Sequence, residues 1–196
     1  MKIIAATNNA GKVKEIKDIL AGVEVISLKE AGLNIDPEEN GVNFEENALI
    51  KARAVAQVSG MPAISDDSGL CVDALDGAPG IYSARYAGED ATDAQRIEKL
   101  LNEMKGLPRE QRKAFFISAA AFVSPDGTEI TATGTVDGYI TEAPDGDGGF
   151  GYDPIFFATS LRKTFGAMSD KEKNSISHRF RAMTNLKKKL VKQGIL

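Results

Sequence analysis

The chain has 196 residues, of which 42% are apolar and 27% are charged, and its formal net charge is −4. A globular chain of this length buries roughly 70% of the surface it exposes when unfolded, so its core is sufficient without disulfides. The acidic balance argues against a nucleic-acid polymer as the main partner, because such proteins carry broad basic surfaces. A small phosphorylated ligand needs only a few local cations and is compatible with this charge.

Cysteine content and hydropathy indicate the compartment. The single cysteine, Cys71, excludes an internal disulfide and a cysteine-based zinc site, and it fits a reducing environment. The first residues, MKIIAATNN, contain no cleavable signal and no membrane span. We therefore expect a cytoplasmic protein with no membrane partner.

The first predicted unit is a strand, a polar turn and a helix. Residues 2–6 form a short apolar run, Thr7 to Lys12 form the turn, and Val13, Ile16 and Leu20 then recur with helical spacing. A helix that starts at such a turn points its backbone N–H groups and positive dipole end at the turn, which favours phosphate. The segment is not a P-loop, because it lacks the first glycine and the Ser/Thr that would bind magnesium. The alternative is an ordinary helix start that Thr7 or Asn9 caps.

The next elements are a strand, a loop and a long helix. We expect a strand at Val23–Ser27 and a polar, solvated loop at Leu28–Gly41, which carries Glu39. The helix is predicted for Phe44–Ser59 and ends at Gly60. Its apolar stripe is Phe44, Ala48, Ala52, Val55 and Ala56, and Glu45 and Lys51 are expected to lie off this stripe.

The stretch from Pro62 combines an apolar run with two adjacent carboxylates. The run ends at Ser65 and is followed by Asp66, Asp67, Ser68 and Gly69, which predicts a strand whose carboxyl end turns sharply. Ligands collect at such strand ends in open α/β sheets. Asp66 and Asp67 either serve one metal together, or one serves chemistry while the other braces the turn. The sequence is also compatible with a plain turn, since these residue types favour turns.

The second half of the chain predicts further helices and a hairpin. Thr92 and Gln95 form a capping box for a helix that ends near Gly106, and Ser169 with Glu172 forms another. Residues 114–124 and 129–139 read as two long strands joined at Pro125-Asp126-Gly127, in an antiparallel pair. The last helix is predicted for residues 178–192, with Phe180, Met183, Leu186 and Leu190 inward and its lysines in solvent.

Two further segments carry polar groups that suit a purine. Residues 145–154 are rich in glycine but follow no clear strand, so they do not indicate a dinucleotide-binding fingerprint. They do not indicate an EF-hand either, because Gly149 and Phe156 occupy its fifth and twelfth ligand positions. Phe150 and Tyr152 offer a stacking face and Asp153 a carboxylate for ring N–H groups, although a glycine-rich loop with core aromatics fits equally. His178, the only histidine, lies near Lys173 and Arg179, and these donors suit a purine carbonyl or a phosphate. A Ser-His-Asp hydrolase is disfavoured because Ser68 lacks a nucleophile elbow.

Six of these pieces, in this order, resemble the inosine/xanthosine triphosphate pyrophosphatases, which remove non-standard purine nucleotides. The matching segments are Thr7-Asn8-Asn9-Ala10-Gly11-Lys12 with Glu15, Phe44–Ala48 with Lys51-Ala52, Ser65–Leu70, Gly77–Arg85, Gly148–Pro154 and Ser177-His178-Arg179. The departures are Asp147, where relatives usually carry Thr, and Phe180 after the His-Arg pair. The resemblance covers nearly the full length of the chain.

The resemblance implies a mixed α/β fold with long central strands. It would be a single domain, residues 1–196, with two lobes around a nucleotide-binding cleft, and would usually form a homodimer. The implied reaction is the magnesium-dependent hydrolysis of ITP, dITP or XTP to the monophosphate and pyrophosphate.

The same resemblance implies roles for individual residues. Asp67 would be the general base and would form a magnesium site with Glu39, supported by Asp66. The implied substrate-binding residues are Thr7, Asn8, Asn9, Ala10, Gly11, Lys12 and Lys51 on the triphosphate side, and Phe150, Gly151, Tyr152, Asp153, Lys173, His178 and Arg179 around the base. Ser68 would also contact the substrate. Donor-only groups such as Arg179 would accept a 6-oxo purine and reject a 6-amino purine. Two alternatives remain: a pyrophosphatase of similar shape for pyrimidine triphosphates such as dTTP or UTP, and a nucleotide-binding sensor without turnover.

Overall fold

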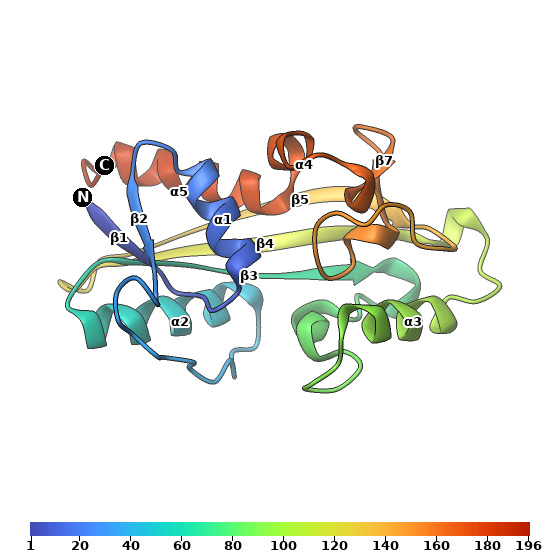
Figure 1. Ribbon diagram of the computed structural model, residues 1–196, viewed down its shortest axis with the longest axis horizontal. Coiled ribbons are helices and arrows are strands. Elements are labelled where there is room, and N and C mark those ends of the chain that lie inside the picture. The colour runs from blue at the N-terminus through green and yellow to red at the C-terminus, as the bar shows by residue number, and fades with distance from the viewer. The chain divides into compact units, whose positions relative to one another are not determined.

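The computed structural model describes all 196 residues, and it contains both helices and strands (Figure 1). The elements are β1 (Lys2–Ala5), α1 (Ala10–Ile19), β2 (Glu24–Ser27), α2 (Phe44–Ser59), β3 (Ala63–Val72), α3 (Asp93–Glu103), β4 (Lys113–Val123), β5 (Glu129–Ile140), β6 (Phe156–Ala158), β7 (Lys163–Thr164), α4 (Asp170–Ile176) and α5 (His178–Lys192), with short 3₁₀ helices between some of them. The boundaries of α2 and α5 are those predicted, and both predicted capping boxes are present, at α3 and α4.

All seven strands belong to one mixed sheet. The strand order is β2-β1-β3-β4-β5-β6-β7. β1 pairs in parallel with β2 and β3, whereas β6 pairs antiparallel with β5 and β7. The α/β fold class and the mixed sheet are therefore confirmed.

The chain divides into two compact units. Unit 1 comprises Met1–Asp67, Ser118–Gly134 and His178–Leu196, and unit 2 comprises Ser68–Ile117 and Thr135–Ser177. β3, β4 and β5 each contribute residues to both units. No helix of the chain combines the length and the apolar character that crossing a membrane requires.

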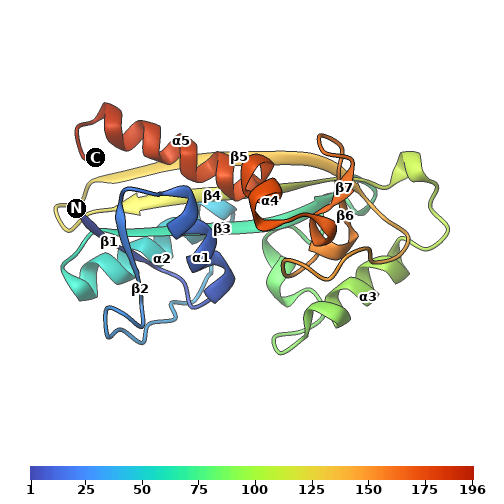
Figure 2. The same ribbon diagram turned by 45° about the horizontal axis from the view of Figure 1, so that its top comes forward.

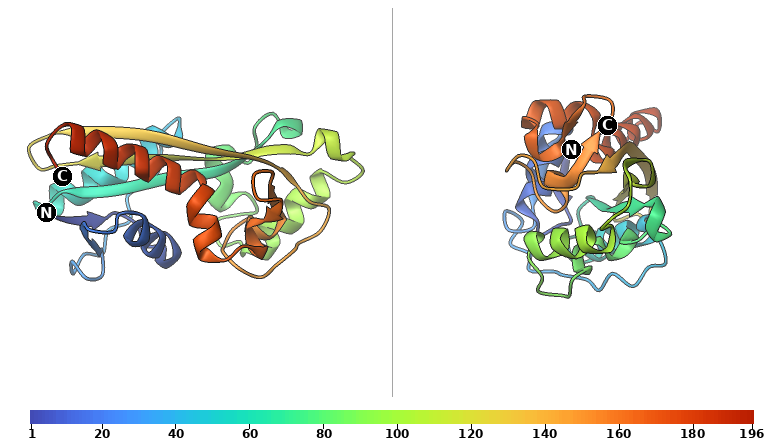
Figure 3. Two further views of the ribbon diagram at one scale, coloured as in Figure 1. Left: turned by 90° about the horizontal axis from the view of Figure 1, so that it is seen from above. Right: turned by 90° about the vertical axis from the view of Figure 1, so that its right-hand side faces the viewer.

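Unit 1 is layered, with helices on both faces of its strands. α1 and α5 pack against each other on one face, and α2 covers the other (Figures 1 and 2). Side chains alternate across a strand, so Ile3 and Ala5 of β1 join the core beneath α1 and α5, and Ile4 joins the core beneath α2. The two chain termini lie near each other in this unit (Figure 3).

Unit 2 has its own hydrophobic core. Leu100 and Met104 of the α3 segment pack with Phe116 of β4 and with Phe156 and Phe165, whose rings form a cluster with centroids 4.6 to 5.8 Å apart. The 3₁₀ helix Gly80–Arg85 was not predicted from the sequence.

The prediction for the central strand is wrong in one respect. The sequence predicted a strand that ends at Ser65 and a turn at Asp66–Gly69, but β3 continues through these residues to Val72. Turn-forming residue types do not end the strand, because Asp66 and Asp67 are both buried and both find partners in neighbouring elements. Tertiary contacts override local propensity here.

Candidate active site

The turn after β1 leads into a helix start that can accept an anion. Asn9 is the N-cap of α1, and its Oδ1 accepts a hydrogen bond from Lys12 N at 3.1 Å. The Asn9 amide in turn donates to Thr7 Oγ1 at 3.2 Å, and Asn8 Nδ2 donates to the Ile35 carbonyl at 3.2 Å. No acidic residue lies in the first turn, so the positive end of the helix dipole is not offset there. The capping interpretation is therefore confirmed, with Asn9 as the cap, and phosphate binding at this helix start remains a prediction.

Asp66 lies at the centre of a buried ion-pair cluster. Its Oδ2 accepts from Arg179 Nε at 3.0 Å and lies 3.3 Å from Lys12 Nζ. Arg179 also donates through Nη1 to Glu15. Arg179 comes from α5, and Lys12 and Glu15 come from α1, so the two helices that share one face of unit 1 meet at this carboxylate.

Opposing effects set the charge of Asp66. Burial by itself would raise the pKa of Asp66, but the positive charges of Arg179 and Lys12 outweigh it and hold this pKa well below its usual value. Burial lowers the pKa of Lys12, while Asp66 opposes that change. For Arg179, the neighbouring Asp66 and Glu15 outweigh burial and raise the pKa. Asp66 is therefore favoured as an anion, and it pairs with two cations.

Asp67 faces the opposite side of the sheet and contacts α2. Its Oδ2 accepts from Asn47 Nδ2 at 3.1 Å, and its Oδ1 lies 3.6 Å from Lys51 Nζ. Lys51 Nζ lies 3.1 Å from Glu39 Oε2, so this ammonium sits between two carboxylates. Lys51 is buried, contrary to the prediction that it lies off the apolar stripe, because Asn47, Ala48, Lys51 and Ala52 share the inward face of α2.

The pKa of Asp67 is shifted in the direction opposite to that of Asp66. Burial raises its pKa above the usual value, and Lys51 and Lys12 only partly offset this, while Glu39 adds to it. A further cation near Asp67 and Glu39 would favour the ionised form. The two neighbouring carboxylates thus have different chemistry, one locked as an anion and one responsive to added charge.

The predicted metal ligands are only partly brought together. Glu39 and Asp67 meet across Lys51, whereas Asp66 turns to Lys12 and Arg179 on the other face. Across the 196 residues, no group of three His, Cys, Asp or Glu side chains has an arrangement that could hold a metal ion. Of the two alternatives left open by the sequence, this geometry favours one carboxylate for chemistry and one for support.

Unit 2 contains five of the seven residues predicted around the base, namely Phe150, Gly151, Tyr152, Asp153 and Lys173. Asp153 Oδ2 accepts from Phe150 N and from Lys173 Nζ, both at 2.8 Å, and Lys173 Nζ lies 4.6 Å from the centre of the Phe150 ring. Asp153 and Lys173 are buried and Phe150 is half-buried. Gly149 has a positive φ of 75°, and a Cβ there would collide with the Asp153 carboxylate, which explains a glycine in this loop.

Tyr152 is anchored and does not offer a free ring face. The ring is buried and its hydroxyl donates to the Ser83 carbonyl at 2.8 Å. Burial raises the pKa of Tyr152, so the phenol keeps this proton. Of the two predicted stacking rings, Phe150 is the more accessible.

The other predicted substrate residues are distributed over both units. Ala10 and Gly11 lie in the first turn of α1, and Ser68 is half-buried in β3. His178 and Arg179 begin α5 in unit 1 and are buried. The contacts of Arg179 described above are with carboxylates, and its predicted role at the base remains a prediction.

Sequence reasoning assigned no role to Asn47 or Glu15, although both lie within the matched segments. Asn47 donates to Asp67 and accepts from Gly41 N at 2.8 Å, so it connects the loop after Glu39 to the carboxylate. The sequence signal that could have identified Asn47 is that it is a polar residue beside the apolar stripe of α2. Nothing local marks Glu15, because its partner Arg179 is 164 residues away.

Comparisons with known proteins agree with the segments matched above. The profile of the Ham1 family matches residues 3–189. A dITP/XTP pyrophosphatase of Clostridium perfringens is 50% identical over 203 residues, covering 100% of this chain and 98% of the relative. A dITP/XTP pyrophosphatase of Bacillus subtilis is 51% identical over 189 residues, covering 95% and 96%.

Solved structures show the same architecture. The Staphylococcus aureus Ham1 protein superimposes with a TM-score of 0.87 at 42% identity, covering 98% of this chain and 100% of that one. A Ham1 protein from Coxiella burnetii gives a TM-score of 0.87 at 39% identity, covering 98% and 99%. On the family profile and these full-length similarities, the chain belongs to the Ham1 family.

Proposed function

We propose that this protein hydrolyses non-standard purine nucleoside triphosphates (ITP, dITP and XTP) to the monophosphate and pyrophosphate. The observation that carries the proposal is that relatives named dITP/XTP pyrophosphatase are 50% and 51% identical over nearly the whole chain. The buried clusters around Asp66 and Asp67 support it, because they place cations and a responsive carboxylate in one unit.

The triphosphate would be bound by the start of α1 and by lysines. The backbone amides at the first turn of α1 and the side chains of Thr7 and Asn9 offer donors for phosphate oxygens. Lys12 and Lys51 supply positive charge, and Lys12 is aligned by its ion pair with Asp66. Their charges would neutralise the phosphates whose bond is broken.

Glu39 and Asp67 would hold a magnesium ion. Their carboxylates come from different segments yet already flank one cation, the Lys51 ammonium, and carboxylate oxygens are the ligands magnesium prefers. Asp66 would support this site from the other face of the sheet through Lys12. When bound, the ion would neutralise phosphate charge and polarise the scissile bond.

Asp67 would orient and deprotonate the attacking water. Asn47 holds one carboxylate oxygen at 3.1 Å, which fixes the direction of the other. A general base must be ionised and able to accept a proton near neutral pH, and a pKa raised by burial brings Asp67 closer to that range.

The base would be recognised by Phe150–Asp153 with Lys173, and by His178 and Arg179. Phe150 offers a ring for stacking, and the Lys173 ammonium is a donor-only group, which suits a 6-oxo purine. A site built from donors would leave them unpaired against the 6-amino group of ATP, and such mismatches discriminate strongly.

The test is a panel of nucleoside triphosphates assayed for pyrophosphate release with magnesium and with chelator. We expect rapid release from ITP, dITP and XTP, little from ATP or dTTP, and none after chelation. Preference for dTTP or UTP would support the pyrimidine alternative, and binding without turnover would support a sensor. Release of orthophosphate instead of pyrophosphate would contradict the proposal.

Two further properties are proposed from the resemblance. We expect a homodimer in the cytoplasm, where the single buried Cys71 would stay reduced. Sedimentation equilibrium should give twice the 20.9 kDa mass of the chain, and a monomer at micromolar concentration would contradict the first expectation.

A further inference from the structure

Asp93, the first residue of α3, accepts a hydrogen bond from the glycine-rich loop, residues 145–154, which belongs to the same unit. Its Oδ2 accepts a hydrogen bond from the Gly151 amide at 2.7 Å, across 58 residues of sequence. Gly151 lies between Phe150 and Tyr152 and has a positive φ of 63°. We propose that Asp93 is a positioning residue for base recognition, which holds the Phe150–Gly151 peptide in its binding conformation. This inference rests on the proposed role of residues 150–153.

The carboxylate of Asp93 is itself held in place. Its Oδ1 pairs with Arg96 Nη2 at 2.9 Å, and Arg96 Nη1 donates to the Ala84 carbonyl at 2.6 Å. The N-terminal capping box of Thr92 and Gln95 fixes the turn from which Asp93 extends. Asp93 thus reaches the loop from a rigid helix end.

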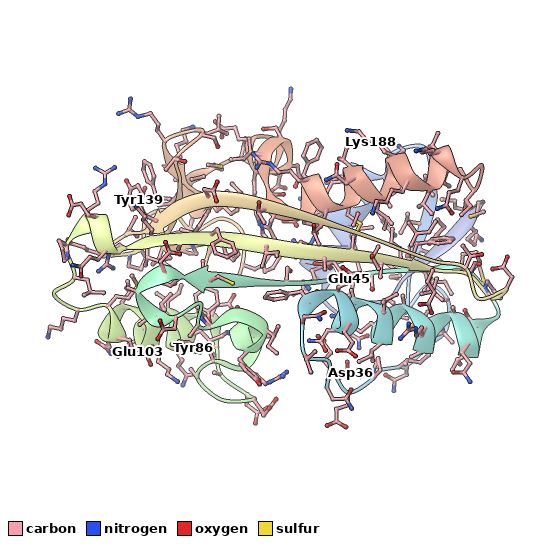
Figure 4. The ribbon with its side chains drawn as sticks, turned by 180° about the vertical axis from the view of Figure 1, so that it is seen from behind. Asp36, Glu45, Tyr86, Glu103, Tyr139 and Lys188 are labelled. Atoms are coloured by element: carbon pink, nitrogen blue, oxygen red, sulfur yellow. The ribbon has the colours of Figure 1, made fainter.

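The segment before α3 is fixed to the same helix. Lys99 Nζ donates to the Tyr86 carbonyl at 2.7 Å, and the Tyr86 hydroxyl donates to Glu103, so the two labelled side chains lie together in Figure 4. Tyr152 donates to Ser83 on that segment. The loop is therefore attached to one support through Gly151 and again through Tyr152.

Asp153 and Asp93 constrain neighbouring peptides of the loop. Asp153 receives the Phe150 amide from within the loop, and Asp93 receives the next amide from α3. Glycine has more accessible backbone conformations than any other residue. A hydrogen bond from the Gly151 amide to a fixed carboxylate therefore restricts the backbone more here than it would at another residue type. A hydrogen bond to a charged acceptor is about twice as strong as a neutral one. Without Asp93, Phe150 would sample orientations that do not stack on the base.

The test compares Asp93→Ala with Asp93→Asn, using dITP as substrate. The alanine variant should raise KM roughly tenfold, the equivalent of one lost charge-assisted hydrogen bond, with kcat within about twofold. The asparagine variant keeps an acceptor for Gly151 and should recover most of the loss. Asp90→Ala, which removes an exposed carboxylate nearby, is the matched control and should behave as wild type. If Asp93 only stabilised the helix, its replacement would not raise KM while leaving kcat nearly unchanged.

Amide hydrogen exchange provides a second measurement that does not depend on turnover. The Gly151 amide should exchange faster in Asp93→Ala than in wild type and Asp93→Asn. Unchanged exchange, an unchanged KM, or an asparagine variant as impaired as alanine would each overturn the inference. A wild-type protein that releases no pyrophosphate from dITP would instead overturn the proposed function. If Asp93→Ala does not fold, Arg96→Met, which removes the partner of Asp93, should show the same increase in KM.

Discussion

Two adjacent carboxylates of β3 have opposite electrostatic environments. Asp66 meets Arg179 and Lys12 on the face covered by α1 and α5, and Asp67 meets Asn47 and Lys51 on the face covered by α2. Burial disfavours charge on both, but only Asp66 has enough nearby positive charge to reverse that effect. The alternation of side chains along a strand therefore separates a carboxylate held as an anion from one whose pKa is raised by burial.

Replacement of Asp67 by asparagine should abolish turnover. The amide has nearly the same shape but cannot accept a proton from water, and loss of a general base typically costs about 10²–10⁴ in rate. Nucleotide affinity, measured by equilibrium dialysis at 4 °C, should change far less than kcat. Asp73→Asn, an exposed carboxylate just beyond the end of β3, is the control. Near-normal turnover in Asp67→Asn would remove Asp67 as the base.

Replacement of Arg179 by alanine should destabilise the fold. It would leave Asp66 buried with much less compensating charge, and removal of one partner of a buried ion pair typically costs about 3–5 kcal/mol. Arg179→Lys should cost less, because it retains the charge and loses only the second contact, to Glu15. Urea denaturation measures both differences. A loss below about 1 kcal/mol in the alanine variant, as expected of an exposed pair, would contradict the buried cluster.

At the scale of elements, carboxylates outside the active site join neighbouring segments. Glu30, after β2, accepts from Lys17 of α1 at 2.8 Å and from the Ser27 amide at 2.6 Å. Glu45 of α2 accepts from Thr131 of β5 at 2.8 Å (Figure 4). These pairs are exposed, so each contributes little to the stability of unit 1.

Glu30 should produce a small acid dependence of stability, because its carboxylate is exposed and solvent screens its ion pair with Lys17. Its hydrogen bonds with Lys17 and with Ser27 lower its pKa from 4.5 to about 2, so its contribution is complete above pH 4.5 and is lost as the pH falls toward 2. The melting-temperature difference between wild type and Glu30→Gln should therefore be largest at pH 5 to 7 and should narrow toward pH 3. Asp18→Asn, at an exposed position of α1, is the control. A difference that does not change with pH would show that Glu30 is not held as an anion.

At the scale of the molecule, ligand binding and folding are linked. Any ion that binds only the folded state stabilises it by RT ln(1 + [L]/Kd), about 2.7 kcal/mol at one hundred times Kd. Because the proposed magnesium ligands come from a loop and from β3, binding would connect two segments of unit 1.

Magnesium should therefore raise the melting temperature of the wild-type protein, and chelator should reverse the change. Glu39→Gln should remove most of this increase without changing the melting temperature in chelator by a similar amount. Glu38→Gln, at the exposed neighbouring position, should respond like wild type. An equal increase in all three proteins would place the ion elsewhere.

The sequence by itself determined most of the elements and named the candidate site residues, whose roles remain predictions. Helical spacing predicted the boundaries of α2 and α5, and Gly60 marked the end of α2. Capping boxes marked the starts of α3 and α4, since these signals act within a few residues of each other. The resemblance to a known family located the carboxylates, lysines and aromatic residues.

Only the tertiary structure decided how these residues are partnered. It extended β3 through Asp66 and Asp67, buried Lys51, and joined Arg179 to Asp66 across 113 residues. It also joined Asp93 to Gly151. These outcomes depend on contacts between distant segments, and a carboxylate that would favour a turn in isolation remains in a strand when buried cations and amides satisfy it.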